Sequence, residues 1–404
     1  MSAPPSDPEH ARVAPPVERR ASPRRHVRPT RIEVDLDAIL ANVASVRALT
    51  GVPVHAVVKA DGYGHGATAV ARALVAHRAV GGLCVSLVEE GVAIHDAGVV
   101  APTLVMGPAQ AGGEDEMIAR AMTPVVSDPG DVERLVAAVA RRGRPVEIHL
   151  KVDTGMTRLG VAIDQLAAIV ARAQAGGLIV VGLMTHFACA DSDDPADPGC
   201  MTYAQLAAFE RATAIARGAG APITVRHTAN SSGAMLFPAA RFDRVRPGIA
   251  IYGNGHWATD AQAAPRRQAM RLCTEVVQIH EVAAGTPVGY GALWRAPRAT
   301  RLAVLPLGYA DGLPRRVTGH AEVLIGGVRC PLVGAISMDI AIADIGAVPH
   351  VRPGALAVLL GDSPEGGAPI STAEYAGWSG LTEYEVTCGM SKRVPRVHVG
   401  GAGG

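Results

Sequence analysis

The sequence predicts an α/β protein with an N-terminal (β/α)8 barrel of the TIM type, followed by a mainly antiparallel β domain. Two observations lead to this prediction. Between residues 30 and 255, short β-rich runs alternate with helical patterns, as expected for a parallel sheet with crossover helices. After Gly253 the helical periodicity nearly vanishes, and β-type runs alternate with Gly/Pro turns.

The first region contains eight strand candidates in about 225 residues, a number and spacing that suit a (β/α)8 barrel. An open doubly wound sheet is the alternative fold. The predicted strands are Val54–Lys59, Leu83–Ser86, Thr103–Met106, Pro124–Ser127, Val146–Lys151, Ile179–His186, Ile223–His227 and Val245–Tyr252. The clearest helical stretches are Ala67–His77, Asp131–Arg142, Asp164–Ala175 and Tyr203–Arg217.

These patterns divide the chain into three parts. Residues 1–30 contain seven prolines and six arginines without an apolar segment, which predicts a disordered tail and no signal peptide. Residues 31–256 are assigned to the barrel, and residues 257–404 to the β domain, with runs such as Thr274–His280, Arg301–Pro306, Ala321–Ile325 and Ala355–Gly361.

Composition narrows the class of function. The formal net charge is +1, so nothing favours nucleic acid or an anionic membrane as partner. No apolar run is long enough to span a bilayer, although 49% of the residues are hydrophobic. Six scattered cysteines have neither metal-type spacing nor a disulfide framework, so we expect no metal site and a reduced, cytoplasmic protein. A small or polar ligand is the remaining expectation.

Chemically versatile side chains gather at the predicted strand ends, where a barrel of this type places its active site. They are Lys59, Lys151, His186, His227–Ser231 and Arg246–Gly248. Of 38 basic residues only Lys59, Lys151 and Lys392 are lysine, and lysine, unlike arginine, can lose its proton and act as a nucleophile. Lys392 is expected to lie far away in the β domain.

The first predicted strand ends in the string Val-Val-Lys-Ala-Asp-Gly-Tyr-Gly-His-Gly, residues 57–66. Desolvation at a barrel mouth lowers the pKa of a lysine and makes the neutral amine of Lys59 available for imine formation. The glycines are expected to let the backbone approach an anion, and Tyr63 to donate its hydroxyl to a phosphate oxygen. A tight βα connection without a ligand is the alternative interpretation.

This string closely resembles the segment of alanine racemases that attaches pyridoxal 5′-phosphate (PLP), and further motifs follow in the family's order over residues 30–398. The resemblance implies a Schiff base between PLP and Lys59. It implies that Lys151 is a candidate for carbamylation that orients Arg158. His186 would stack on the pyridine ring and Arg246 would face the pyridine nitrogen. The implied cofactor-binding residues are Lys59, Tyr63, Arg158, His186, Asn230, Ser231, Arg246, Gly248, Ile249 and Tyr384.

Motifs in the predicted β domain resemble the rest of the family's site. Tyr290, within Val-Gly-Tyr-Gly, resembles the second catalytic base, while Tyr309 and Met338 resemble residues that close the site on the substrate side. Arg158 is also implied in substrate binding, and Met338 through its backbone amide to the substrate carboxylate. Five of the chain's seven tyrosines fall in these motifs, although aromatic residues make up only 3% of the chain.

The resemblance predicts an isomerase that interconverts L-alanine and D-alanine by two-base proton transfer at Cα of a PLP aldimine. Lys59 would serve one face of Cα and Tyr290 the other. A guanidinium only donates hydrogen bonds, so Arg246 implies an unprotonated pyridine nitrogen and a weaker electron sink, which disfavours decarboxylation and transamination. The product would be a precursor of peptidoglycan.

Family members are dimers in which Tyr290 would act in the partner's barrel, so a homodimer is expected. Two other functions stay open: a racemase of serine or of several small amino acids, and a non-catalytic PLP-binding protein. Ser337 stands where relatives often have cysteine, and Trp294 and Trp257 are unusual for the family. Either tryptophan is compatible with a narrowed entrance or with simple surface packing.

Overall fold

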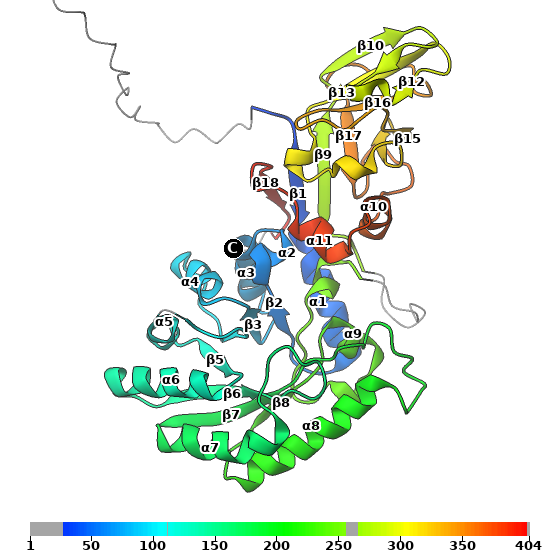
Figure 1. The fold of residues 1–404 in the computed structure, drawn as a ribbon. Coiled ribbons are helices and arrows are strands. Elements are labelled where there is room, and N and C mark those ends of the chain that lie inside the picture. Colours follow the sequence, from blue (N-terminus) through cyan, green and yellow to red (C-terminus); the bar gives the residue numbers. More distant parts are fainter. Residues whose placement is uncertain (1–26, 111, 256–265, 402–404) are drawn as a thin grey trace, which may run out of the picture.

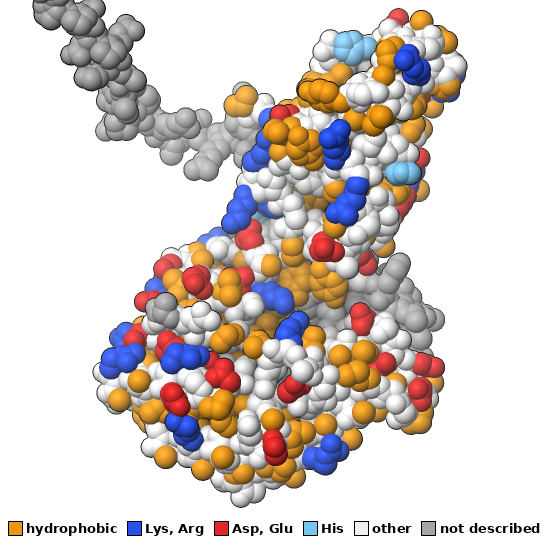
Figure 2. Space-filling view, in the orientation of Figure 1, with side chains coloured by type: hydrophobic (Ala, Val, Ile, Leu, Met, Phe, Trp, Pro, Cys, Tyr) orange, Lys and Arg blue, Asp and Glu red, His pale blue; other side chains and the backbone are white. Residues whose placement is uncertain are grey.

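The computed structural model describes residues 27–110, 112–255 and 266–401. These form two lobes (Figure 1), and the molecule narrows to a waist between them (Figure 2). The lower lobe is a curved parallel sheet surrounded by helices, and the upper lobe consists mainly of antiparallel strands. The predicted fold class is therefore confirmed. Among the described helices, none has the length and apolar character needed to cross a membrane.

The sheet of the lower lobe has seven parallel strands hydrogen-bonded in chain order, β2 to β8. Strand β6 has the predicted bounds, and most of the others are one or more residues shorter than predicted. The strands are β2 (His55–Val57), β3 (Gly82–Val85), β4 (Thr103–Val105), β5 (Thr123–Val126), β6 (Val146–Lys151), β7 (Leu178–Met184) and β8 (Val225–His227). They are buried nearly throughout, as expected for a parallel sheet that helices cover.

The eighth predicted strand, Val245–Tyr252, is wrong as a strand. Its second half, Ile249–Tyr252, is a 3-10 helix (η3). Pro247 has no N–H to donate to a ladder and restricts the residue before it, so the apolar run cannot continue as a strand. A short buried apolar run does not by itself distinguish strand from helix, which explains the error.

The first half of that run nevertheless closes the barrel. The His55 N–H donates to the Val245 carbonyl at 2.9 Å, on the β2 side of the segment. On the other side, the Arg246 N–H donates to the carbonyl of Ala229, just after β8, at 2.9 Å. Residues 245 and 246 thus bridge the first and last strands of the sheet and bring Arg246 to the same end as Lys59.

Crossover helices cover the outside of this sheet. Helix α6 (Pro129–Arg142) shows why they form where they do: Asp128 caps its N-terminus, and Gly143 ends it in the left-handed conformation. Its buried face includes Val132 and Leu135. The other crossover helices are α3 (Ala67–Ala76), α4 (Val88–Asp96), α5 (Gly113–Ala119), α7 (Leu166–Ala175) and α8 (Met201–Gly218). Helix α1 (Leu36–Thr50) precedes β2, the short α2 (Lys59–Tyr63) follows β2 at the end of the barrel, and α9 (Ser231–Leu236) follows β8.

The upper lobe is built on a six-stranded sheet in the order β15-β14-β17-β9-β1-β18, with a three-stranded sheet β10-β13-β16 and a small ribbon β11-β12. Two helices, α10 (Thr372–Ser379) and α11 (Glu383–Cys388), end near the waist (Figure 1). The strands are β9 (Met270–Glu275), β10 (Gln278–Val282), β11 (Pro287–Val288), β12 (Trp294–Arg295), β13 (Thr300–Leu305), β14 (Glu322–Ile325), β15 (Val328–Pro331), β16 (Ala341–Asp344), β17 (Leu356–Leu360) and β18 (Arg396–Val399).

Strand β1 (Arg31–Asp35) belongs to the upper sheet, although the sequence analysis placed residue 31 at the start of the barrel. It pairs antiparallel with β9 and parallel with β18. Its alternating pattern, with Ile32 and Val34 buried, is that of a half-buried strand and contains no information about which sheet it joins. From β1 in the upper lobe, the chain enters the barrel through α1.

Most of the predicted tail, residues 1–26, lies outside the described residues, as does Trp257. The part of it that the structure describes makes specific contacts with the upper lobe. Thr30 is fully buried, and its hydroxyl donates to the Pro306 carbonyl at 2.7 Å. Arg28 forms hydrogen bonds with Asp311. The prediction of a disordered tail over residues 1–30 is therefore wrong for Arg28 and Thr30.

Candidate active site

Lys59 begins a turn of unusual backbone conformation at the end of β2. The next residues, Ala60, Asp61 and Gly62, all have left-handed values, with φ of 52°, 53° and 62°. A left-handed conformation costs a non-glycine residue about 1–2 kcal/mol. Such a turn persists only where surrounding contacts hold it, and backbone strain of this kind concentrates at functional sites.

The contacts that hold this turn come from side chains. The carboxylate of Glu90, on α4, accepts a hydrogen bond from the Ala60 N–H at 2.6 Å. Asp61 accepts one from the Ala67 N–H at 2.9 Å and so ties the turn to the start of α3. The buried His65 ring contacts the carbonyls of Gly62 and Tyr63 through Nδ1, and burial lowers its pKa to about 4, so the neutral ring donates to them.

Two glycines of the motif stand where no side chain would fit. A Cβ on Gly64 would stand 2.1 Å from the Thr387 carbonyl oxygen, and one on Gly66 would stand 2.7 Å from the His398 ring. They therefore allow the C-terminal segment to pack against the Lys59 turn. This packing brings α11, with Tyr384, to the barrel mouth.

A cavity of about 410 Å³ lies at this end of the barrel, and all ten residues predicted to bind the cofactor line it. Four further residues line it and were not predicted as site residues: Val57 and Ala60, which flank Lys59 in its motif, and Met106 and Cys388, which no quoted motif contains. Lys151 does not line the cavity but is buried behind it.

One part of the cavity is a polar cradle. The Ser231 hydroxyl accepts hydrogen bonds from the Gly248 and Ala250 N–H groups at 2.9 and 3.3 Å. A Cβ on Gly248 would stand 2.2 Å from the Tyr63 hydroxyl oxygen, so only glycine fits there. Burial raises the pKa of Tyr384 to about 12, so its hydroxyl keeps its proton and can donate it to an anion.

The cavity and its surroundings are rich in positive charge. Burial, then the neighbouring Arg158, lower the pKa of Lys59. Burial, followed by Arg158 and Arg246, lowers the pKa of Lys151 to about 8. The pKa of His186 is also well below its ordinary value, mainly through burial, so this ring is neutral. Such a surplus of cations suits a dianionic ligand such as a phosphate ester.

Arg246 is nearly completely buried and is held by several acceptors. One terminal nitrogen contacts His227 Nδ1 at 2.6 Å and donates to the His227 carbonyl at 2.8 Å. The other donates to the carbonyls of Thr185 and Thr228 at 2.8 and 3.0 Å. None of these acceptors is a carboxylate, so the guanidinium keeps an uncompensated positive charge, although burial lowers its pKa to about 10.

His227 extends this arrangement into the barrel interior. Because arginine only donates, His227 Nδ1 must accept, and its Nε2 then carries the hydrogen. That Nε2 lies 2.7 Å from His149 Nδ1, which accepts the bond. Burial lowers the pKa of both rings, consistent with neutral imidazoles. The sequence placed His227 at a strand end but contained no signal that it contacts His149.

The other three predicted residues lie in the upper lobe. Tyr290, Tyr309 and Met338 line a second cavity of about 510 Å³, between η5 (Tyr290–Ala292), η6 (Tyr309–Asp311) and the 336–340 loop. Tyr290 is 72% exposed. Within one chain the structure therefore places the two predicted catalytic groups, Lys59 and Tyr290, in separate cavities.

The structure also shows where Lys392 and Trp294 lie. Lys392 does not lie far from the barrel: it lines a neighbouring cavity together with Ala60 and Asp61, because the C-terminal segment folds back onto the Lys59 turn. Trp294 packs beside a small apolar cluster of Val288, Leu302 and Val333 in the upper lobe, which favours the packing interpretation.

Comparison with known proteins assigns both lobes. Residues 34–255 match the family model of the alanine racemase N-terminal domain, and residues 269–398 match that of the alanine racemase C-terminal domain. The chain belongs to the alanine racemase family. The alanine racemase of Sorangium cellulosum is 42% identical over 384 residues, covering 92% of this chain and 99% of that protein.

The solved structures agree with this family. The alanine racemase from D-cycloserine-producing Streptomyces lavendulae has a TM-score of 0.85 with 33% identity, covering 93% of this chain and 98% of that one. The alanine racemase of Streptomyces coelicolor A3(2) has a TM-score of 0.83 with 35% identity, covering 92% and 98%. The two-lobed architecture is thus that of the alanine racemase family over nearly its whole length.

Proposed function

We propose that this protein is an alanine racemase that interconverts L-alanine and D-alanine with PLP as cofactor. The observation that carries the proposal is the convergence of ten motif residues on one barrel-mouth cavity, with a buried lysine of lowered pKa beside arginines. The family membership of both lobes supports it. The free state of all six cysteines is compatible with work in the cytoplasm, where D-alanine would supply peptidoglycan synthesis.

The residues present fit PLP in charge and in shape. Tyr63, Ser231, Gly248, Ile249 and Tyr384 would hold the phosphate group, where a cradle of hydroxyls and backbone N–H groups meets a glycine that cannot take a Cβ. Asn230 caps α9 beside Ser231 through its side chain and so keeps this segment in place.

The remaining predicted ligands would surround the ring. Arg158 would meet the phenolic oxygen, His186 would stack on the ring, and Arg246 would face the pyridine nitrogen. Backbone carbonyls and the neutral His227 ring hold the guanidinium group of Arg246 in place. Because a guanidinium has only N–H donors, it can offer the pyridine nitrogen nothing but a hydrogen-bond donor. This arrangement favours simple proton return over the side reactions that a protonated pyridine promotes.

In the reaction, Lys59 would carry the cofactor at rest and move a proton at Cα once the amino acid takes its place. PLP, when bound, withdraws electrons from Cα and makes its proton acidic. The lowered pKa of Lys59 favours the neutral amine, which is the form that accepts a proton. The residues that line the cavity would hold the amino acid close to the Lys59 amine and so favour the transfer.

A second base is needed on the opposite face of Cα, and we propose that it is Tyr290 of a second copy. Tyr290 is exposed and shares its cavity with Tyr309 and Met338, so this surface is available to a partner. A two-fold homodimer would bring it to the partner's barrel mouth and build two equivalent sites. Arg158 and the Met338 backbone amide would then hold the substrate carboxylate.

Alanine is the substrate that tests this function. We expect the purified protein loaded with PLP to convert each alanine enantiomer into the other with equal kcat/KM, because mirror images have equal free energies. In deuterated water the α-hydrogen should exchange, and serine and lysine should react more slowly. A protein that binds PLP without exchange would be a carrier, and release of carbon dioxide would indicate a decarboxylase; either result would overturn the proposal.

We also propose that Lys151 is carbamylated and orients Arg158. Its amine would form a bond with the carbon of CO2 and release one proton, which turns a buried cation among other cations into an anion. Only the neutral amine reacts, and its fraction rises as the pH rises through the pKa of about 8.

Native mass spectrometry at fixed CO2 concentration checks this expectation. The mass of one added CO2 per chain should be more abundant above pH 8 than below it, and absent from Lys151→Ala. Buffer freed of CO2 should remove the added mass from the wild type. If Lys151→Ala or the wild type in CO2-free buffer showed the same added mass as the wild type with CO2, the carbamylation of Lys151 would be contradicted.

A further inference from the structure

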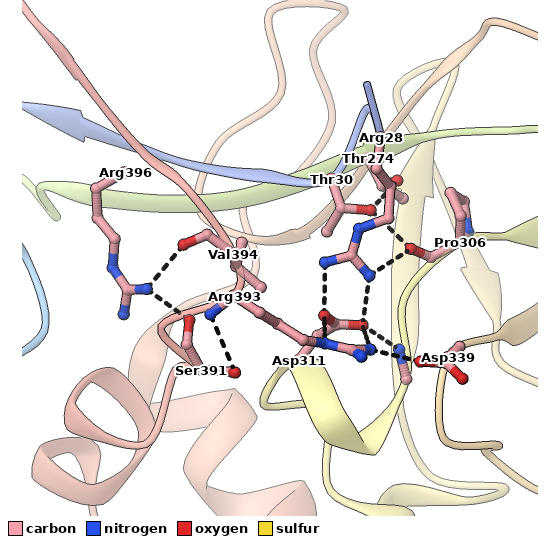
Figure 3. Close-up of polar contacts among 11 residues, drawn as sticks. Arg28, Thr30, Thr274, Pro306, Asp311, Asp339, Ser391, Arg393, Val394 and Arg396 are labelled. Carbon is pink, nitrogen blue, oxygen red and sulfur yellow. Dashed lines mark hydrogen bonds and ion pairs between the residues drawn. The ribbon is translucent and has the colours of Figure 1, made fainter. Parts of the chain in front are cut away.

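A fully buried carboxylate joins three distant parts of the upper lobe. Asp311, at the end of η6, accepts two hydrogen bonds from Arg28 at 2.7 and 3.1 Å and two from Arg393 at 2.7 and 3.0 Å. The Gly308 N–H donates to the same carboxylate at 2.9 Å. Figure 3 shows the two guanidinium groups beside Asp311; they come from two separate segments, one before β1 and one before β18. We call Arg28, Asp311, Arg393 and Asp339 the Asp311 clamp.

The clamp is electrically balanced. Arg393 also donates to Asp339 at 2.7 Å, so two arginines face two carboxylates. Burial works against the charge on Asp311, but hydrogen bonds from Arg393 and Arg28 outweigh it and lower the pKa of that carboxyl below its ordinary value. Loss of either arginine would leave a buried carboxylate with half of its charge-assisted bonds.

Two loops of the candidate substrate side depend on this clamp. Asp311 belongs to the segment that presents Tyr309, and Asp339 follows Met338 directly. The loops are also joined through their backbones, since the Tyr309 N–H donates to the Ser337 carbonyl and the Ala310 N–H to the Met338 carbonyl, both at 3.0 Å. Arg393 therefore forms ion pairs with both loops, through Asp311 in one and Asp339 in the other.

The Tyr309 and Met338 loops approach each other closely at Gly308. A Cβ on Gly308 would stand 2.2 Å from the Ser337 carbonyl oxygen and 2.5 Å from the Met338 carbonyl oxygen. A shift of Asp311 would thus pass directly to the loop that carries the Met338 amide. Tyr309 and Met338 themselves are 42% and 52% exposed, so their own packing does little to fix them.

Arg28 comes from outside every motif that the sequence analysis singled out. Besides Asp311 it contacts the Pro306 carbonyl, which Thr30 also binds, and Thr30 in turn contacts Thr274 of β9 at 2.9 Å. The segment before β1 is thereby anchored beside the loop that leads to Tyr309. The side chain of Arg28 is 32% exposed, so it can be replaced without opening the core.

We propose that Arg28 is a positioning residue for substrate binding: by completing the charge around Asp311, it fixes the Tyr309 and Met338 loops where the amino-acid carboxylate binds in the partner's site. This inference rests on the proposed racemase function and on the use of Met338 in it. Arg28 touches neither substrate nor cofactor, and its effect passes through Asp311 and Arg393.

The test compares Arg28→Gln with Arg31→Gln. Arg31 is a matched control, because it also lies in the N-terminal segment and forms an ion pair, but with Glu33 on β1. Hydrogen–deuterium exchange of peptides covering residues 305–313 and 335–341 reports on the loops without any need for activity. KM for L-alanine and the inhibition constant of propionate, which has the carbon skeleton and carboxylate of alanine, report on carboxylate binding.

We expect faster exchange in both loops of Arg28→Gln, and a rise of about tenfold in KM and in the inhibition constant, the size expected for the loss of a charged hydrogen bond. The value of kcat should change much less, Arg28→Lys should recover part of the affinity, and Arg31→Gln should behave as wild type. If hydrogen–deuterium exchange in the two loops of Arg28→Gln were unchanged, the proposal that Arg28 holds these loops would be wrong. If exchange were faster but KM and the inhibition constant were unchanged, the proposed role of Arg28 in substrate binding would be wrong. A wild type inactive on alanine would instead refute the racemase function, while the exchange data would still decide the clamp.

Discussion

Lys59→Ala is expected to lower kcat/KM for alanine by at least about 1,000-fold, because it removes the group that carries the cofactor and one of the two bases. Lys59 is the only lysine that lines the barrel-mouth cavity among the described residues. Its lowered pKa, caused by burial and by Arg158, prepares the neutral amine for both tasks.

The measurement combines racemisation rates with chemical trapping. Borohydride treatment of the wild type should fix PLP on the peptide that contains Lys59, and the same treatment should leave no PLP attached to Lys59→Ala. Lys392→Ala is the control, since Lys392 lines only the neighbouring cavity and should keep full activity. Cofactor trapped on a peptide other than that of Lys59 would contradict the assignment.

Tyr290→Phe is expected to lower kcat by about 100- to 10,000-fold, the usual contribution of a general acid–base group. The substitution removes only the hydroxyl of a side chain that is 72% exposed, so the free energy of unfolding should barely change. Tyr203→Phe, in barrel helix α8, is the matched control and should retain activity. Racemisation of both enantiomers, measured with thermal unfolding, checks this expectation.

Mixed dimers decide where Tyr290 acts. If each site combines Lys59 of one chain with Tyr290 of the other, a dimer of one Lys59→Ala chain and one Tyr290→Ala chain contains one intact site and one doubly defective site. Random reassociation of equal amounts should therefore recover about a quarter of the wild-type sites. Absence of recovery, with mixed dimers demonstrated by mass, would refute action in the partner's site.

Much of the fold could be predicted because local patterns determine it. The 3.6-residue period and the caps of α6 are visible in the sequence, and β6 was found with its bounds. The barrel-mouth residues could also be predicted, since parallel strands all present their carboxyl ends on one side. The full set of ten cofactor-binding residues, which includes Arg158 and Tyr384 away from the strand ends, is implied by the family resemblance, and all ten line one cavity.

The errors arose where local pattern and long-range pairing differ. Strand β1 has an ordinary alternating pattern, and only its pairing with β9 and β18 assigns it to the upper sheet. The sequence also contains no signal that Gly64 and Gly66 face Thr387 and His398, which come from the other end of the chain. The left-handed turn after Lys59 had no signal, since two of its residues are not glycine.

The sequence by itself determined which chemical groups this protein has: a scarce lysine at the end of a buried strand, a donor-only arginine, and tyrosines of which five in seven fall in motifs. Only the tertiary structure decided what those groups face. Arg28 and Asp311 are 283 residues apart, and Arg246 meets His227 and then His149 inside the barrel. Side-chain periodicity reports which face of an element is buried, whereas a specific contact depends on how whole elements pack, and that is decided by the folded chain as a whole.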